Sequence, residues 1–316
     1  MNICKESLAR LLAVLVVMAW ASGAALAAAG PLVNDDWLAK NLKKPDVVVL
    51  DVGEFDHYEQ KHIPGAVKAF GPWQAVNEKY QPSMMPQVSD LVGMVRGYGV
   101  NRDSLVVIYD EGTSAQDTAK SARALWTLHA LGHGKVAILD GGFAAWEQAG
   151  KPVSTEPVVP RPGNFTGTLA PAKLATLAEV KKGLGSARVV LVDDRSPEEN
   201  FGHEKKSYIN RYGHLPGSRL WPAAFMTTAG VQFSPSFMRN GKELQEMARG
   251  VGIPADKNVE IITYSDRGLE AALGYYVLHD LLGYRNVKLY DGSMLEAAAV
   301  KSVPLETNTW GYMKKR

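Results

Sequence analysis

The chain has 316 residues, more than one typical hydrophobic core contains, so its length favours two domains. Apolar residues make up 46% and charged residues 22%, which excludes a largely disordered chain. The formal net charge of +2 is spread along the sequence, which excludes the basic patch typical of nucleic-acid binding. We therefore expect a globular protein with no nucleic-acid partner.

The first element is a predicted secretory signal over residues 1–27. Lys5 and Arg10 precede an apolar run that closes on Ala25-Leu26-Ala27, a typical cleavage site. An uncleaved membrane anchor is the alternative, because the run approaches the length of a membrane span. No later run is apolar for long enough, so we expect no membrane span after cleavage. The predicted location is periplasmic or secreted.

Cysteine usage limits the chemistry of the mature chain. The single cysteine, Cys4, lies inside the predicted signal. After cleavage the protein would have no disulfide and no thiolate of its own.

One sequence unit then occurs twice. The apolar run Val47–Asp51 is followed by His62-Ile-Pro-Gly65, and Val189–Asp193 is followed by His214-Leu-Pro-Gly217. A short apolar run that ends in Asp predicts a buried strand, and the same order of landmarks in both halves indicates an internal repeat.

The repeat continues through a second strand, a helix and a third strand. The runs Leu105–Asp110 and Val259–Ser265 each end in Tyr plus a polar residue and lead into a helical pattern. A further strand pattern closes each half on an Asp-Gly pair, at Asp140 and Asp291.

Alternating strands and helices predict an α/β fold with two tandem domains, each a mostly parallel sheet flanked by helices. We place the first domain at residues 31–152 and the second at 173–316. Residues 153–172 are rich in proline and have the composition of a linker.

The segment after Val259 is the predicted functional loop. A strand ends at Tyr264, a six-residue polar loop runs from Ser265 to Glu270, and a helix begins at Ala271. A tight loop before a helix N-terminus directs backbone N–H groups to one point and favours anions.

These landmarks resemble the rhodanese family, specifically its two-domain thiosulfate and 3-mercaptopyruvate sulfurtransferases. The resemblance is carried by Asp193 with Arg195, by Gly213–Gly217, by Tyr264–Ala271 and by the terminal Asp-Gly-Ser, and it covers nearly all of the chain after the signal. It implies two rhodanese-like domains, the first of them structural.

The resemblance also implies that a catalytic cysteine should follow Tyr264, where its thiolate accepts a sulfane sulfur and passes it on. This chain has Ser265 there, and Asp110 at the matching position of the first half. A serine hydroxyl cannot carry a persulfide, so we predict that sulfur transfer is lost and leave enzyme activity uncertain. The alternatives are sulfur transfer by a route without cysteine and a Ser265-dependent hydrolase, which would need a base such as His203 or His214.

The predicted site consists of Ser265 with an anion-binding set around it. The set contains Arg195, Asp266, Arg267, Gly268, Leu269, Glu270 and Ala271. Arg195 matches the family residue that contacts the anionic donor; a surface ion pair with Asp194 or Glu198 is the alternative. A binding module for a small oxyanion or a protein of the cell envelope is the function we expect.

We expect simple structural roles for two other groups of residues. His129 and His133 have the spacing of half a zinc site, but with no further ligand in sequence reach we expect a core or capping role and no metal or cofactor. The segment 205–211 is basic and is read as a solvated loop, with a position along the cleft as the alternative.

Overall fold

The computed structural model describes residues 30–74, 84–228 and 234–311, and the chain from Pro31 onward forms one compact unit. The predicted signal, residues 1–27, lies outside the described residues. Within those residues no helix combines the length and the apolar character that a membrane span needs.

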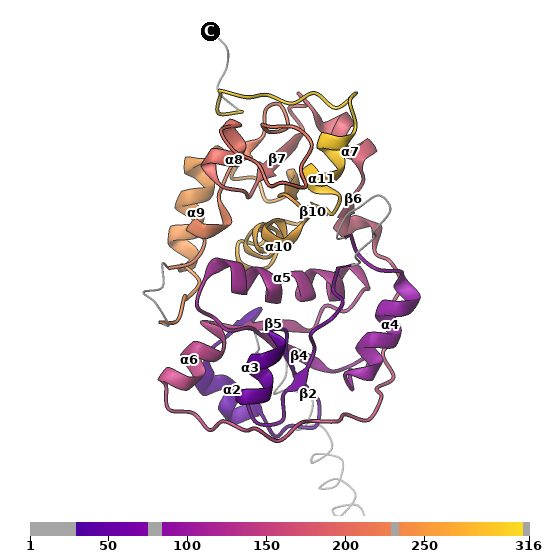
Figure 1. The fold of residues 1–316 in the computed structure, drawn as a ribbon, viewed down its shortest axis with the longest axis vertical. Coiled ribbons are helices and arrows are strands. Elements are labelled where there is room, and N and C mark those ends of the chain that lie inside the picture. The colour runs from indigo at the N-terminus through magenta and orange to yellow at the C-terminus, as the bar shows by residue number, and fades with distance from the viewer. Residues whose placement is uncertain (1–29, 75–83, 229–233, 312–316) are drawn as a thin grey trace, which may run out of the picture. The chain divides into compact units, whose positions relative to one another are not determined.

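The first half is built on a five-stranded parallel sheet (Figure 1). Its strand order is β1-β5-β4-β2-β3, and the strands are β1 (Leu32–Val33), β2 (Val47–Asp51), β3 (Val67–Lys68), β4 (Leu105–Tyr109) and β5 (Val136–Leu139). The flanking helices are α2 (Asp35–Asn41), α3 (Phe55–Gln60), α4 (Val88–Gly97), α5 (Ala115–Ala130) and α6 (Gly142–Gln148). The central strand β4 is buried throughout, as its continuous apolar sequence predicts for a sheet covered on both faces.

The second half repeats this topology. Its strand order is β6-β10-β9-β7-β8, and the strands are β6 (Leu174–Ala175), β7 (Val189–Asp193), β8 (Arg219–Leu220), β9 (Glu260–Tyr264) and β10 (Asn286–Tyr290). Its helical segments are η1 (Pro171–Lys173), α7 (Leu177–Gly183), α8 (Pro197–Phe201), η2 (Ala223–Phe225), α9 (Gly241–Gly250), α10 (Leu269–Tyr276), the π-helical turn η3 (Val277–Leu281) and α11 (Ser293–Ala299). Both parallel α/β sheets are therefore as predicted.

Equivalent contacts confirm that the two halves are copies of one unit. The hydroxyl of Tyr109 accepts a hydrogen bond from the N–H of Ile63 at 3.2 Å, and that of Tyr264 accepts one from Leu215 at the same distance. In each case a tyrosine at the end of the central strand holds the His-x-Pro-Gly turn against the sheet.

The histidines of these turns have structural roles in both copies. His62 pairs with Ser154 and His214 with Glu306 as isolated antiparallel bridges, and both histidines are fully buried. Their Nδ1 atoms bond the backbone carbonyls of the preceding helices. The two histidines therefore pack in the core and stabilise the turns.

Helices α5 and α10 pack against each other between the two sheets (Figure 1). Both contribute fully buried apolar side chains to one core, among them Leu125 and Leu128 from α5 and Leu273 from α10. Two polar contacts also cross between the halves: the N–H of Met85 bonds Asp291, and that of Met238 bonds Asp140. Each terminal Asp-Gly turn thus accepts a hydrogen bond from the opposite half.

Candidate functional site

The predicted loop lies at the carboxyl end of β9. It is shorter than expected, because α10 begins at Leu269 and not at Ala271. Gly268 has a φ of 81°, a left-handed conformation that glycine adopts without steric cost, and this residue caps the helix. The loop is therefore Ser265–Gly268, and Glu270 and Ala271 belong to the first turn of α10.

Ser265 is fully buried, and its polar atoms are engaged within the chain. Its Oγ accepts a hydrogen bond from the N–H of Gly268 at 3.1 Å, and its own N–H donates to Oγ of Ser293 at 3.1 Å. Among the described residues no histidine hydrogen-bonds this hydroxyl, and Nδ1 of His214 bonds the carbonyl of Asn200. The base that a serine hydrolase needs is therefore not in place.

Asp266 lies in the loop with only 3% of its surface exposed. Its Oδ1 is 3.8 Å from Nη1 of Arg195 and has no hydrogen-bond partner within the described chain. Burial raises the pKa of Asp266 to about 8; Arg195 opposes the rise, and the neighbouring Glu199 adds to it. Near neutral pH the carboxyl therefore carries less negative charge than the sequence suggests.

Arg195 is not the surface cation that one reading of the sequence predicts. It is 2% exposed, and its Nε and Nη2 donate to the two carboxylate oxygens of Asp193 at 2.9 and 2.7 Å. Nη2 also donates to the carbonyl of Gly213 at 2.9 Å. The alternative prediction, a surface ion pair with Asp194 or Glu198, is wrong. The carboxylate that Arg195 binds with two hydrogen bonds is Asp193, the last residue of β7. Arg195 thus ties the His-x-Pro-Gly turn to the sheet.

The remaining loop residues differ in exposure. Arg267 is exposed, and its guanidinium lies 5.9 Å from the ring of Tyr208. Gly268 and Leu269 are buried, and the carbonyl of Gly268 lies 3.5 Å from Nη1 of Arg123 in the first half. The structure therefore brings the predicted site residues together without giving them one common surface.

A cleft of about 400 Å³ takes its walls from both halves and includes Glu270 of the first turn of α10, but none of the loop residues Ser265–Gly268 lines it. Arg195 and Glu270 are the predicted site residues in its wall. The cleft also contains Asp194 and Glu199, which sequence reasoning did not place in the site, and Lys206, for which a position along the cleft was the alternative prediction. Lys206 lies 3.4 Å from Glu199, so part of the predicted basic loop does reach the cleft.

Asp194 is the most unusual group in this wall. It is 1% exposed, and neither carboxylate oxygen has a hydrogen-bond partner within the described chain. Burial raises the pKa of Asp194 well above its usual range, and the nearby Asp193 and Glu270 raise it further. The sequence signal was Asp193-Asp194-Arg195 at the end of a strand, but only the structure shows that Arg195 hydrogen-bonds Asp193 and not Asp194.

Two copies of a parallel five-stranded α/β unit, each with a Tyr-ended central strand, define a tandem rhodanese architecture. The family model described as "Rhodanese-like domain" matches residues 34–149 and 176–299. The chain belongs to the rhodanese family.

Several named relatives cover almost the same span. The sulfur carrier protein TtuD of Thermus thermophilus is 30% identical over 291 residues, covering 87% of this chain and 95% of the relative. The thiosulfate sulfurtransferase of Cricetulus griseus is 30% identical over 289 residues, covering 84% and 91%. The crystal structure of SseA from Escherichia coli, a 3-mercaptopyruvate enzyme, is 25% identical with a TM-score of 0.70, covering 84% and 99%. The chain is a relative of thiosulfate and 3-mercaptopyruvate sulfurtransferases.

Proposed function

We propose that this chain is an exported, periplasmic or secreted member of the family that has lost sulfur transfer and acts as a binding module. Ser265 directly follows the tyrosine that ends β9, where the family resemblance places the nucleophilic cysteine. The observation that carries the proposal is the contact of its hydroxyl with the N–H of Gly268. That N–H would stabilise a thiolate at this position, and here it bonds a neutral oxygen.

The chemistry of the hydroxyl supports this loss of activity. An alcohol is a weak nucleophile without an adjacent base, and the described residues supply none to Ser265. The only cysteine, Cys4, falls within the proposed signal. A thiosulfate-to-cyanide assay of the purified mature chain should give the same rate as Ser265→Ala. Turnover clearly above that control would contradict the proposal.

The proposed ligand is a small oxyanion or an acidic group of a cell-envelope protein that enters the cleft. Nη1 of Arg195 makes no hydrogen bond within the described chain, and neither do the backbone N–H groups of Asp266 and Arg267. The raised pKa values of Asp194 and Asp266 reduce the negative charge that would repel an anion. Of these donors, Arg195 lines the cleft, and Glu270 brings the first turn of α10 to its wall. A cation and a helix N-terminus favour a negatively charged ligand.

Thermal unfolding with added thiosulfate or sulfate tests this part. We expect a saturable rise in melting temperature that shrinks in Lys206→Gln and grows in Glu270→Gln, because the two substitutions remove opposite charges from the cleft wall. Both side chains lie in the wall, so neither change disturbs the buried Arg195–Asp193 pair. If the ligand-induced rise in melting temperature is the same in the unaltered chain and in both variants, binding in this cleft is contradicted.

A further inference from the structure

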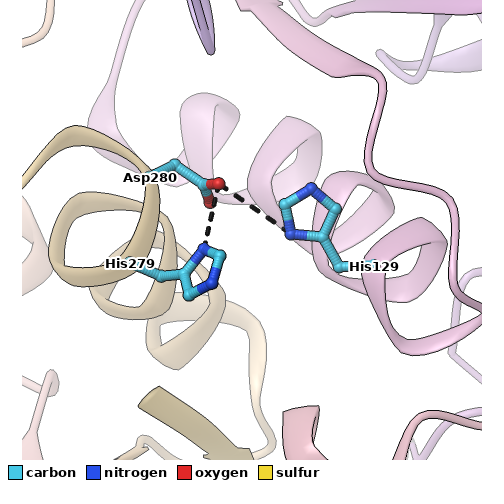
Figure 2. Close-up of side chains that lie close together, drawn as sticks. All are labelled: His129, His279 and Asp280. Atoms are coloured by element: carbon cyan, nitrogen blue, oxygen red, sulfur yellow. Dashed lines mark hydrogen bonds and ion pairs between the residues drawn. The ribbon is translucent and has the colours of Figure 1, made fainter. Parts of the chain in front are cut away.

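Two histidines and one aspartate from opposite halves of the molecule meet beside α5. His129 comes from α5, and His279 and Asp280 come from the π-helical turn η3 that continues α10. Oδ1 of Asp280 lies 3.0 Å from Nδ1 of His279 and 3.9 Å from Nδ1 of His129. Figure 2 shows the three side chains converging between the two helices.

The internal repeat explains why two histidines face each other here. Leu128-His129 and Leu278-His279 occupy equivalent places in the two copies of the unit. His129-Ala-Leu-Gly132 in the first copy corresponds to His279-Asp-Leu-Leu-Gly283 in the second, which has one additional residue. That extra residue coincides with the π-helical turn, a geometry that is frequent at functional sites.

We propose that Nδ1 of His129, Nδ1 of His279 and the carboxylate of Asp280 bind a divalent transition-metal ion, with Zn²⁺ as the best match. Two imidazoles and one carboxylate are a common ligand set for zinc sites that keep one position open. Ligand atoms on a tetrahedral zinc ion lie about 3.4 Å apart, given bonds of about 2.1 Å. The two separations from Asp280 fall on either side of this value. Nδ1 of His129 also lies 3.2 Å from the hydroxyl of Tyr275, a contact that an ion would replace.

The open position would face a cavity of about 320 Å³ that all three residues line. Oδ2 of Asp280 is buried and has no hydrogen-bond partner within the described chain. Nε2 of His133, in the wall of the same cavity, is also without a partner there, and that residue is 5% exposed. Buried polar atoms are rarely left unpaired, so these two atoms are available to an ion or to a water molecule that the ion binds.

Lys173 contacts the ring nitrogen of His279 that faces away from Asp280. Its Nζ lies 2.7 Å from Nε2 of His279, so Nε2 accepts from the ammonium and the imidazole proton lies on Nδ1, which faces Asp280. A metal ion at Nδ1 would displace that proton and leave an Nε2–H that faces Lys173. Lys173→Gln removes a positive charge near the ion and supplies an amide oxygen that can accept from Nε2–H when Nδ1 binds. We expect this variant to bind Zn²⁺ at least as tightly as the unaltered chain. Weaker binding would contradict the assignment to Nδ1.

Isothermal titration of the full chain with ZnCl₂, after removal of bound metal by a chelator, tests the site. We expect one Zn²⁺ per chain, and a loss of affinity of at least about tenfold in His279→Gln and in Asp280→Asn. The amide introduced by Asp280→Asn retains an oxygen that can accept from His279, so the interface should still fold. The matched control is His203→Gln, which changes an exposed histidine outside the cluster and should bind normally.

Two results would overturn the proposal. One is the absence of saturable binding by the unaltered chain. The other is an equal loss of affinity in His203→Gln and His279→Gln, which would indicate adventitious binding to surface histidines. Thermal unfolding of each variant without metal verifies that it is folded. Co²⁺ absorption provides an independent readout, since its visible bands should appear in the unaltered chain and be lost in Asp280→Asn.

Discussion

Arg123 of α5 and Asp291 after β10 form an ion pair across the boundary between the two halves, with 2.5 Å between Nη1 and Oδ1. Both side chains are buried, with 2% and 4% of their surface exposed. The same Nη1 lies 3.5 Å from the carbonyl of Gly268. The first half therefore helps to hold the loop that contains Ser265.

Arg123→Met should lower the free energy of unfolding by about 3–5 kcal/mol, because it leaves Asp291 buried without its charge partner. Urea unfolding measures the change. Arg123→Met combined with Asp291→Asn should lose less than the sum of the two single variants, since the pair acts as a unit. Lys135→Met, which removes one partner of the exposed pair with Asp103, serves as control and should change stability by less than about 1 kcal/mol. Equal losses in Arg123→Met and Lys135→Met would contradict the account.

Asp110, the first-half counterpart of Ser265, predicts a pH dependence of stability. Burial raises the pKa of Asp110 to about 7, while Ser121 and Gly112 hydrogen-bond its oxygens. The folded state therefore keeps a proton that the unfolded state loses near pH 4, so this stabilising contribution is full at low pH and is lost as pH rises toward 7.

Asp110→Asn should remove this dependence, because the amide is neutral and still accepts from Gly112. Between pH 5 and pH 8 the unaltered chain should lose roughly 3 kcal/mol more than the variant in urea unfolding. Asp103→Asn, at an exposed carboxylate, should retain the full pH dependence. Parallel pH profiles for the unaltered chain and Asp110→Asn would show that Asp110 is ionised in the fold.

The basic segment 205–211 is not only a solvated loop, because Arg211 binds the C-terminal end of α11. Its guanidinium donates four hydrogen bonds of 2.8–2.9 Å to backbone carbonyls at the end of α11 and just beyond it. Arg211→Lys should destabilise the protein by about 1.5–3 kcal/mol, because an ammonium cannot satisfy four carbonyls in a plane. Lys205→Met, at a partly exposed neighbouring position, is the control for charge alone. Thermal or urea unfolding measures the loss of stability in each variant. Equal losses in Arg211→Lys and Lys205→Met would contradict this capping role.

Ser265→Cys tests whether the scaffold of the donor site survives. We expect the variant to form thiocyanate from thiosulfate and cyanide faster than the unaltered chain, because the N–H of Gly268 would stabilise the new thiolate. Ser265→Ala provides the background. If Ser265→Cys stays at that background while folding normally, the surrounding groups, and not the hydroxyl alone, prevent the reaction.

The sequence predicted the sheets well because their signal is local. Runs such as Val47–Asp51 end in an aspartate and recur at matching places, so strand, turn and repeat could be assigned together. The start of α10 was misplaced by two residues because the polar residues on either side of Leu269 resemble a loop, and the helix boundary depends on the left-handed Gly268.

The side-chain partners could not be predicted, since they depend on contacts between distant segments. Arg195 has several carboxylates close to it in the sequence, and only the fold selects Asp193. His129 lacked a ligand set within sequence reach because His279 and Asp280 lie in the other half. The raised pKa of Asp194 likewise follows from burial that composition does not reveal.

The central claim is that Ser265 cannot accept sulfur. The most direct measurement is the intact mass of the purified mature chain after incubation with thiosulfate and removal of the donor, beside Ser265→Cys treated identically. We expect no added sulfur atom on the unaltered chain. A protein-bound sulfur atom that cyanide removes from the unaltered chain would contradict this claim.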